Sequence, residues 1–176
     1  MSTPDLRSLI RDIPDFPKPG IVFKDITPLL LDPAAVDAAV RQIADWARPR
    51  DVEFVVAAEA RGFIFGAALA RELEAGFVPA RKPGKLPGET VSAEYILEYG
   101  VDALEMHADA LAHGARVLLH DDLLATGGTA AALCELVEGR GATVAGVSFL
   151  VELAFLGGRE KLSAYDVQTL IAYDSE

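Results

Sequence analysis

The sequence predicts an α/β fold in which a central, mostly parallel sheet is flanked by helices. Short apolar runs alternate along the chain with amphipathic stretches of about 10–15 residues, which is typical of βαβ units. Several apolar runs lack polar alternation, as expected for strands of a parallel sheet that is covered on both faces. The chain has 176 residues, and its sequence contains no repeat or polar linker. We therefore expect a single domain spanning residues 1–176.

The N-terminal part is expected to begin irregularly and to become helical at Pro33. Residues 4–12 are compatible with a short helix that ends near Pro14. Residues 14–33 contain five prolines, which predicts a rigid, irregular connection. Asp32-Pro33 then opens a helix over about 33–47, with proline in the first turn, where its missing N–H costs little.

The remaining elements alternate between strands and helices. We expect strands at 53–58, 77–81, 91–99, 103–107, 116–120, 143–151 and 167–172, helices at 62–74 and 128–139, and a helical turn at 158–162. The intervening KPGKLPGET, residues 82–90, is predicted to form a mobile surface loop. In parallel sheets with right-handed crossovers, ligands bind at the carboxyl ends of the strands. The segments that begin at Glu59, Lys82, Asp121 and Glu152 are therefore where we expect the chemistry.

Composition and charge exclude several classes of protein. Sixteen Lys and Arg face 27 Asp and Glu, and the net charge of −11 argues against nucleic acid as a partner. No apolar stretch reaches the about 18 residues of a membrane span, and the N-terminus lacks a signal peptide, so we expect a cytoplasmic protein with no membrane partner. Cys134, the single cysteine, excludes an intrachain disulfide and is expected in the core.

The segment VLLHDDLLATGGT, residues 117–129, gives the strongest indication of a binding site. An apolar strand leads into Asp121 and Asp122, and Thr126-Gly127-Gly128-Thr129 follows at a helix start. A helix N-terminus favours phosphate, and glycines let the backbone approach it closely. The two carboxylates can bind ribose hydroxyls, directly or through hydrated Mg²⁺. TGGT alone is more typical of a capping turn, but strand, acids and glycine turn together predict a sugar-phosphate site.

Two further segments supply positive charge after predicted strands. In EARGF, residues 59–63, backbone amides and Arg61 can meet an anion; the alternative is a surface Arg61 paired with Glu59. Arg81, Lys82 and Lys85 form the densest basic stretch of an acidic chain and can neutralise a phosphate group, although a solvated basic loop is the more common explanation. The chain contains neither a GxxxxGK[ST] loop nor a GxGxxG turn, which argues against an NAD-type dehydrogenase.

Residues 117–129 resemble the binding motif of the type I phosphoribosyltransferases. DDLLATGGT is similar to the form found in the adenine branch of that family. Further segments resemble that branch in order and spacing: IPDFPKPGIVFKDITPLL (13–30), EARGFIFG (59–66), RKPGKLPGET (81–90), YILEYGVDALEMH (95–107) and GGREKL (157–162). The resemblance implies a pentosyltransferase of purine salvage that converts adenine and 5-phosphoribosyl-1-pyrophosphate into AMP and pyrophosphate, and it implies a homodimer.

The resemblance also implies roles for individual residues. It implies a small hood, formed by about residues 1–32, in which Val22, Phe23 and Lys24 contact the base. Glu98 would be the hydrogen-bond partner or proton carrier for the base, with Tyr99 beside it. The other expected binding residues are Glu59, Ala60, Arg61, Arg81, Lys82, Lys85, Asp121, Asp122, Ala125, Thr126, Gly127, Gly128 and Thr129.

For catalysis we expect Glu98, Arg61, Asp121 and Asp122 to act together. Mg²⁺ is the expected cofactor, bound mainly through substrate and water rather than by direct protein ligands. The resemblance further implies a non-proline cis peptide bond near Glu59-Ala60.

Two alternatives for the function stay open. A xanthine or hypoxanthine/guanine phosphoribosyltransferase would share most of this chemistry, but FPKPGIVFKDITPLL and LEYG favour adenine. A non-catalytic regulator that binds 5-phosphoribosyl-1-pyrophosphate would keep residues 121–129 without needing the basic loop or Glu98, and both are present.

Overall fold

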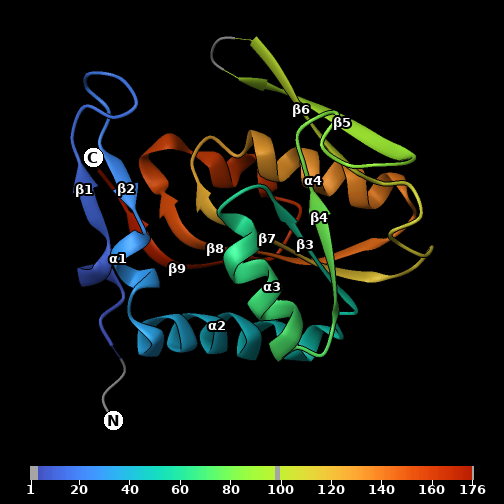
Figure 1. Ribbon diagram of the computed structural model, residues 1–176, viewed down its shortest axis with the longest axis horizontal. Coiled ribbons are helices and arrows are strands. Elements are labelled where there is room, and N and C mark those ends of the chain that lie inside the picture. The colour runs from blue at the N-terminus through green and yellow to red at the C-terminus, as the bar shows by residue number, and fades with distance from the viewer. Residues whose placement is uncertain (1–3, 98–99, 176) are drawn as a thin grey trace.

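The computed structural model describes residues 4–97 and 100–175 and is built around a five-stranded parallel sheet. Its strands are, in spatial order, β4 (Gly76–Ala80), β3 (Phe54–Ala58), β7 (Arg116–Leu124), β8 (Thr143–Leu153) and β9 (Val167–Tyr173). Helices cover both faces of the sheet (Figure 1). The predicted fold class is confirmed.

Each face of the sheet has its own hydrophobic core. Helices α2 (Pro33–Ala47) and α3 (Gly62–Glu72) lie on one face, and α4 (Gly128–Gly139) lies on the other (Figure 1). The side chain of Asp32 caps α2 by accepting hydrogen bonds from two amides of its first turn, as the Asp32-Pro33 pair predicts. Cys134 lies buried in α4, as expected. Among the described residues, no helix is long and apolar enough to cross a bilayer.

The strand order places a binding crevice between β3 and β7. Helix α3 connects β3 to β4 on one side of it, and the chain then returns to the other side of β3 to form β7. At such a reversal of strand order, the loops leaving the two neighbouring strands diverge to opposite faces and open a crevice. Arg61 lies in the segment after β3, and the 121–129 motif spans the end of β7 and the turn into α4.

Strands β5 (Thr90–Leu97) and β6 (Gly100–His107) form an antiparallel hairpin that packs over α4 (Figure 1). The hairpin was expected, but its second strand begins at Gly100 rather than at 103. The register places Tyr95 opposite Asp102, which brings a phenol and a carboxylate together. The last two residues of the predicted strand 91–99 lie outside the described residues.

The predicted helix over residues 4–12 is wrong. Only a short 3-10 helix, η1 (Arg7–Leu9), forms there, and β1 (Arg11–Ile13) follows and pairs with β2 (Phe23–Asp25). Residues 14–33, expected to be irregular, contain β2 and the short helix α1 (Thr27–Leu30). Long-range pairing between β1 and β2 therefore overrides the local helical pattern.

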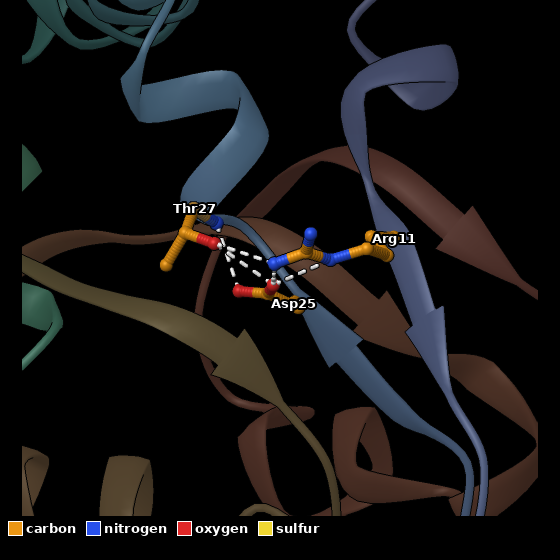
Figure 2. A network of polar contacts seen from close by, with 3 residues as sticks. All are labelled: Arg11, Asp25 and Thr27. Atoms are coloured by element: carbon orange, nitrogen blue, oxygen red, sulfur yellow. Dashed lines mark hydrogen bonds and ion pairs between the residues drawn. The ribbon is translucent and has the colours of Figure 1, made fainter.

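A buried carboxylate joins β1, β2 and α1. Asp25 accepts hydrogen bonds from the amide and hydroxyl of Thr27, at 2.9 and 2.8 Å, and from the Arg11 guanidinium at 2.6 Å (Figure 2). The Thr27 amide and the Arg11 side chain together hold the pKa of Asp25 below its ordinary value despite burial. The network fixes the segment that carries Phe23 and Lys24.

The C-terminal strand anchors the same segment from the other side. The Tyr173 ring, at the end of β9, lies beneath the Lys24 ammonium at 4.4 Å and the Arg7 guanidinium at 4.7 Å. The 3-10 helices η2 (Arg48–Arg50), η3 (Ala154–Leu156) and η4 (Gly158–Leu162) complete the fold. The last of them confirms the predicted helical turn.

Candidate active site

A cleft of about 450 Å³ opens at the carboxyl ends of β3 and β7. It brings together residues from the three segments that were singled out in the sequence. The lining residues are Glu59, Ala60, Arg61, Lys82, Tyr95, Leu104, Asp121, Asp122, Leu123, Ala125 and Thr129. The crevice at the reversal of strand order is therefore the place where eight of the predicted site residues meet: Glu59, Ala60, Arg61, Lys82, Asp121, Asp122, Ala125 and Thr129.

Asp121 and Asp122 lie on β7, whereas a loop was expected to begin at Asp121. Strand β7 continues to Leu124 because the long neighbour β8 keeps pairing with it, as far as Leu124 opposite Glu152. An apolar run ending at His120 gave no sign of this extension. The consequence is that both carboxylates are held by a strand backbone rather than by a flexible loop.

The two carboxylates occupy a strongly perturbed electrostatic environment. Burial and the neighbouring charge of Asp122 raise the pKa of Asp121 well above its ordinary value. Burial also raises the pKa of Asp122, and the Arg61 guanidinium opposes that shift. The Arg61 Nε atom lies 2.7 Å from the Asp122 carboxylate, whose side chain is only 6% exposed. Such a pair of neighbouring acids with raised pKa values in a cleft is typical of a functional site.

The turn between β7 and α4 forms a small cavity of about 70 Å³, lined by residues 123–130 and Phe149. Gly127, the N-cap residue of α4, has a φ of +81°, a backbone conformation that disfavours any side chain. Because the N-cap is a glycine, no threonine hydroxyl takes the N-cap position, contrary to the simple capping alternative for TGGT. Amides of the first helical turn have no partner within the helix and can bind an anion.

Arg61 lies at the start of α3, beside Asp122 rather than beside Glu59. The Glu59-Ala60 peptide bond is cis, which confirms that expectation. Gly62 allows the start of α3 to lie against β7, because a Cβ atom there would come within 2.8 Å of Asp121 Oδ1. The Arg61 guanidinium also lies 4.9 Å from the centre of the Phe23 ring. Arg61 thus joins the N-terminal segment to the acids of β7.

The basic residues after β4 differ in their surroundings. Arg81 pairs with Glu59 at 3.1 Å, and Glu59 also accepts a hydrogen bond from the Lys82 amide at 2.6 Å. Lys82 pairs through its ammonium with Asp102 and contacts the Tyr95 hydroxyl. Only Lys85 is exposed, as a solvated basic loop predicts.

Tyr95, Asp102, Leu104 and Leu123 were missed as site residues. The first three come from the β5–β6 hairpin, and their proximity to Lys82 depends on its register and packing. Alternation along β5 could have indicated that Tyr95 and Ala93 share the inward face.

Comparison with known proteins identifies the family of this chain. The sequence model described as the phosphoribosyl transferase domain matches residues 30–174. An adenine phosphoribosyltransferase from Kosmotoga olearia is 56% identical over 169 residues, which are 96% of this chain and 99% of that protein. The chain belongs to the adenine phosphoribosyltransferase family.

Solved structures of this family share its fold with the chain. Adenine phosphoribosyltransferase from Thermoanaerobacter pseudethanolicus has a TM-score of 0.93 at 54% identity, covering 96% of this chain and 98% of that one. The enzyme from Saccharomyces cerevisiae, complexed with adenine and an imino-altritol bisphosphate, has a TM-score of 0.88 at 41% identity and covers 94% and 96% of the two chains.

The N-terminal residues expected to contact the base are held in place by other side chains. The Phe23 ring packs edge-to-face against Phe16, with ring centres 5.2 Å apart, and the Arg61 guanidinium lies over the Phe23 ring. The Lys24 side chain is buried and bound to Asp12 at 2.8 Å, which leaves only its backbone for ligand contact. Glu98 and Tyr99, the other expected base contacts, lie outside the described residues.

In this member of the adenine phosphoribosyltransferase family, a buried histidine precedes the two acids. The Ser148 hydroxyl donates to the Leu119 carbonyl at 3.2 Å, so His120 Nδ1–H is the donor in its 2.9 Å contact with Ser148 Oγ. His120 Nε2 is then an acceptor without a partner among the described residues. Burial lowers the pKa of His120 from 6.5 to about 3, so the imidazole is neutral.

Replacing His120 with Leu is expected to make the fold less sensitive to acid. Between pH 6.5 and 3, His120 binds a proton in the unfolded chain but stays neutral in the folded protein. The free energy of unfolding therefore decreases as pH falls from 6.5 towards 3. The free energy of unfolding of His120→Leu, minus that of the wild type, should rise by up to about 1.4 kcal/mol per pH unit below pH 6.5. Urea denaturation at pH 7.5, 6 and 5 measures this difference; parallel pH profiles would contradict it.

Proposed function

We propose that this chain transfers the phosphoribosyl group of 5-phosphoribosyl-1-pyrophosphate to adenine, giving AMP and pyrophosphate. The observation that carries the proposal is the convergence, in one cleft at the β3–β7 crevice, of the paired acids, Arg61, and Ala125 and Thr129 at the two ends of the glycine turn. Membership of the adenine phosphoribosyltransferase family supports the choice of base.

The sugar phosphate binds along the end of β7 and the start of α4. Ala125 to Thr129 hold the 5′-phosphate through backbone amides, with the hydroxyls of Thr126 and Thr129 as additional donors. Asp121 and Asp122 bind the ribose hydroxyls, and their negative charge favours the positive charge that develops on the sugar. Because β7 holds both carboxylates rigidly, little reorganisation is needed during the reaction.

The pyrophosphate leaves towards the segments that follow β3 and β4. Arg61, Arg81 and Lys85 neutralise its charge as the bond from its oxygen to the anomeric carbon breaks, and Lys82 and the backbone at Glu59 and Ala60 complete the pocket. Arg61 and Arg81 each have a carboxylate partner without substrate. Phosphate oxygens replace those partners, and the 82–90 loop closes over the site as a lid.

Mg²⁺ fits the donors of this site. The carboxylates of Asp121 and Asp122 are hard oxygen ligands, and a nearby cation would offset the burial and mutual repulsion that raise the pKa of Asp121. The two acids would hold the ion through water. When bound, Mg²⁺ supplies positive charge to the pyrophosphate and the ribose.

Residues 1–32 form the hood over the base within a single domain. Phe23 stacks on the purine, and backbone groups of Val22 and Lys24 read its edge. Glu98 hydrogen-bonds the base and takes the proton released when the new C–N bond forms, with Tyr99 beside it. We further propose a cytoplasmic homodimer, as the family resemblance implies.

Turnover with four purine bases tests the proposal. With Mg²⁺ and 5-phosphoribosyl-1-pyrophosphate, adenine should be consumed and hypoxanthine, guanine and xanthine should not. Chelation of Mg²⁺ by EDTA should abolish the reaction. Turnover of a 6-oxopurine alone would contradict the choice of base. Binding of 5-phosphoribosyl-1-pyrophosphate without turnover of any base would instead indicate a regulator.

A further inference from the structure

We propose that the turn at residues 157–162 is a brace that sets the shape of the phosphate-binding turn, with Gly158 as its positioning residue. This inference rests on the proposed function, because it assumes that residues 125–129 hold the 5′-phosphate. The turn, GGREKL, has no part in the reaction as described so far. It consists of Gly157 and η4.

Gly158 and the phosphate-binding turn meet backbone against backbone. A Cβ atom on Gly158 would overlap the Ala125 carbonyl oxygen and lie 2.9 Å from the Gly127 amide nitrogen. A Cβ atom on Gly127 would likewise overlap the Gly158 carbonyl oxygen and lie 3.2 Å from Gly158 Cα. Backbone atoms cannot rotate away as a side chain can, so neither position accepts a methyl group without displacing the other turn.

The brace is anchored to the sheet through Arg159. Its guanidinium binds both carboxylate oxygens of Glu152, at 3.0 and 2.6 Å, and donates to the Val167 carbonyl at 3.1 Å and the Thr169 hydroxyl at 3.2 Å. Glu152 is buried at the end of β8, directly opposite Leu124 of β7. A bidentate arginine–carboxylate pair of this kind fixes the orientation of the Arg159 side chain as well as its distance from Glu152.

The core holds the other end of the brace. Leu162 is fully buried in the cluster that packs α4 against the sheet. Gly158 therefore lies in a segment that is fixed by Arg159, which is bound to β8 and β9, and by Leu162, which packs in the core between α4 and the sheet. The phosphate-binding turn lies between β7 and α4. The brace contacts it at Ala125 and Gly127, and the brace is itself held to the sheet by Arg159 and Leu162.

The brace predicts a selective effect on one substrate. Displacing residues 125–127 would misplace the amides that bind the 5′-phosphate while leaving the N-terminal segment around Phe23 unchanged. Gly158→Ala should raise KM for 5-phosphoribosyl-1-pyrophosphate by about tenfold or more and change KM for adenine by less than about twofold. A general loss of folded protein would lower the apparent kcat and leave both KM values unchanged.

Gly139→Ala is the matched control. Gly139 ends α4, and a Cβ atom there would meet nothing within 4 Å. Gly139→Ala should have the same KM values as the wild type. Turnover of adenine by the wild type and by Gly139→Ala tests the proposed function without reference to the brace. If they are active and Gly158→Ala has an unchanged KM for 5-phosphoribosyl-1-pyrophosphate, the brace is refuted while the function stands.

A second variant covers the case in which Gly158→Ala does not fold. The double replacement Glu152→Gln with Arg159→Met removes the ion pair between these two residues without leaving an unpaired buried charge. It should also raise KM for 5-phosphoribosyl-1-pyrophosphate selectively. Equal changes in the two KM values, or no change in either, would overturn the proposal.

Discussion

Replacing Asp121 and Asp122 together with Asn is expected to lower kcat/KM by at least about 10³-fold, because two charges that face the developing positive sugar are lost at once. Asparagine keeps the size of each side chain and its ability to hydrogen-bond ribose hydroxyls. The loss should therefore reflect charge rather than shape. Steady-state kinetics with adenine as the second substrate measures it.

The fold should survive this change. Asp121→Asn removes a carboxylate whose pKa is raised by burial and by Asp122. Since the folded pKa of Asp121 lies above its unfolded value, ionisation of this group destabilises the fold as pH rises through the folded pKa. The free energy of unfolding of Asp121→Asn should therefore increase relative to that of the wild type as pH rises from the unfolded pKa of Asp121 to its folded pKa, and the difference should stay constant above it.

A surface carboxylate provides the control for the acid pair. Asp37 is exposed on α2 and pairs with Arg41 one helical turn away, so Asp37→Asn should leave kcat/KM unchanged. Activity of the double variant within about tenfold of this control would remove the assigned role of Asp121 and Asp122.

Arg61→Met is expected to lower kcat/KM by about 10²- to 10³-fold, because the leaving pyrophosphate loses a preorganised cation. Arg61 is the cation bound to Asp122 and placed beside Phe23, so it lies between the proposed sites of the two substrates. Arg61→Lys should recover part of the loss, since lysine keeps the charge but not the fork of donors. Pre-steady-state measurement of AMP formation checks the chemical step directly.

Arg41→Met is the matched control for Arg61, because Arg41 is an exposed arginine that also pairs with a carboxylate. Arg61→Met also leaves the buried carboxylate of Asp122, which is 6% exposed, without its partner, so a loss of stability is expected beside the loss of activity and the free energy of unfolding should be measured with it. Full activity in Arg61→Met would show that the pyrophosphate leaves elsewhere.

Most of the sheet could be predicted because its signals are local. The apolar runs predicted at 53–58, 116–120 and 143–151 correspond to β3, β7 and β8, and Asp32-Pro33 marks the start of α2. The errors occur where pairing between distant segments decides the outcome. Residues 11–13 become a strand only because 23–25 lies beside them, and β7 extends to Leu124 only because β8 is long.

The residues of the candidate site also fall into two groups, those with a local sequence signal and those placed by distant segments. Arg61, Asp121, Asp122 and the glycine turn could be predicted because each lies at or just beyond the carboxyl end of a strand, and parallel strands end on one side of the sheet. Tyr95 and Asp102 could not, since the hairpin register and the position of Lys82 bring them there. The Lys24 side chain was unpredictable for the same reason, because Asp12 and Tyr173 bind it from two other strands.

A crystal structure of the complex with AMP tests the phosphate assignment most directly. The 5′-phosphate should lie in the turn between Ala125 and Thr129, within hydrogen-bond distance of its amides, and the ribose hydroxyls should face Asp121 and Asp122. A phosphate bound at the basic loop, or anywhere else outside this turn, would contradict the proposed mechanism.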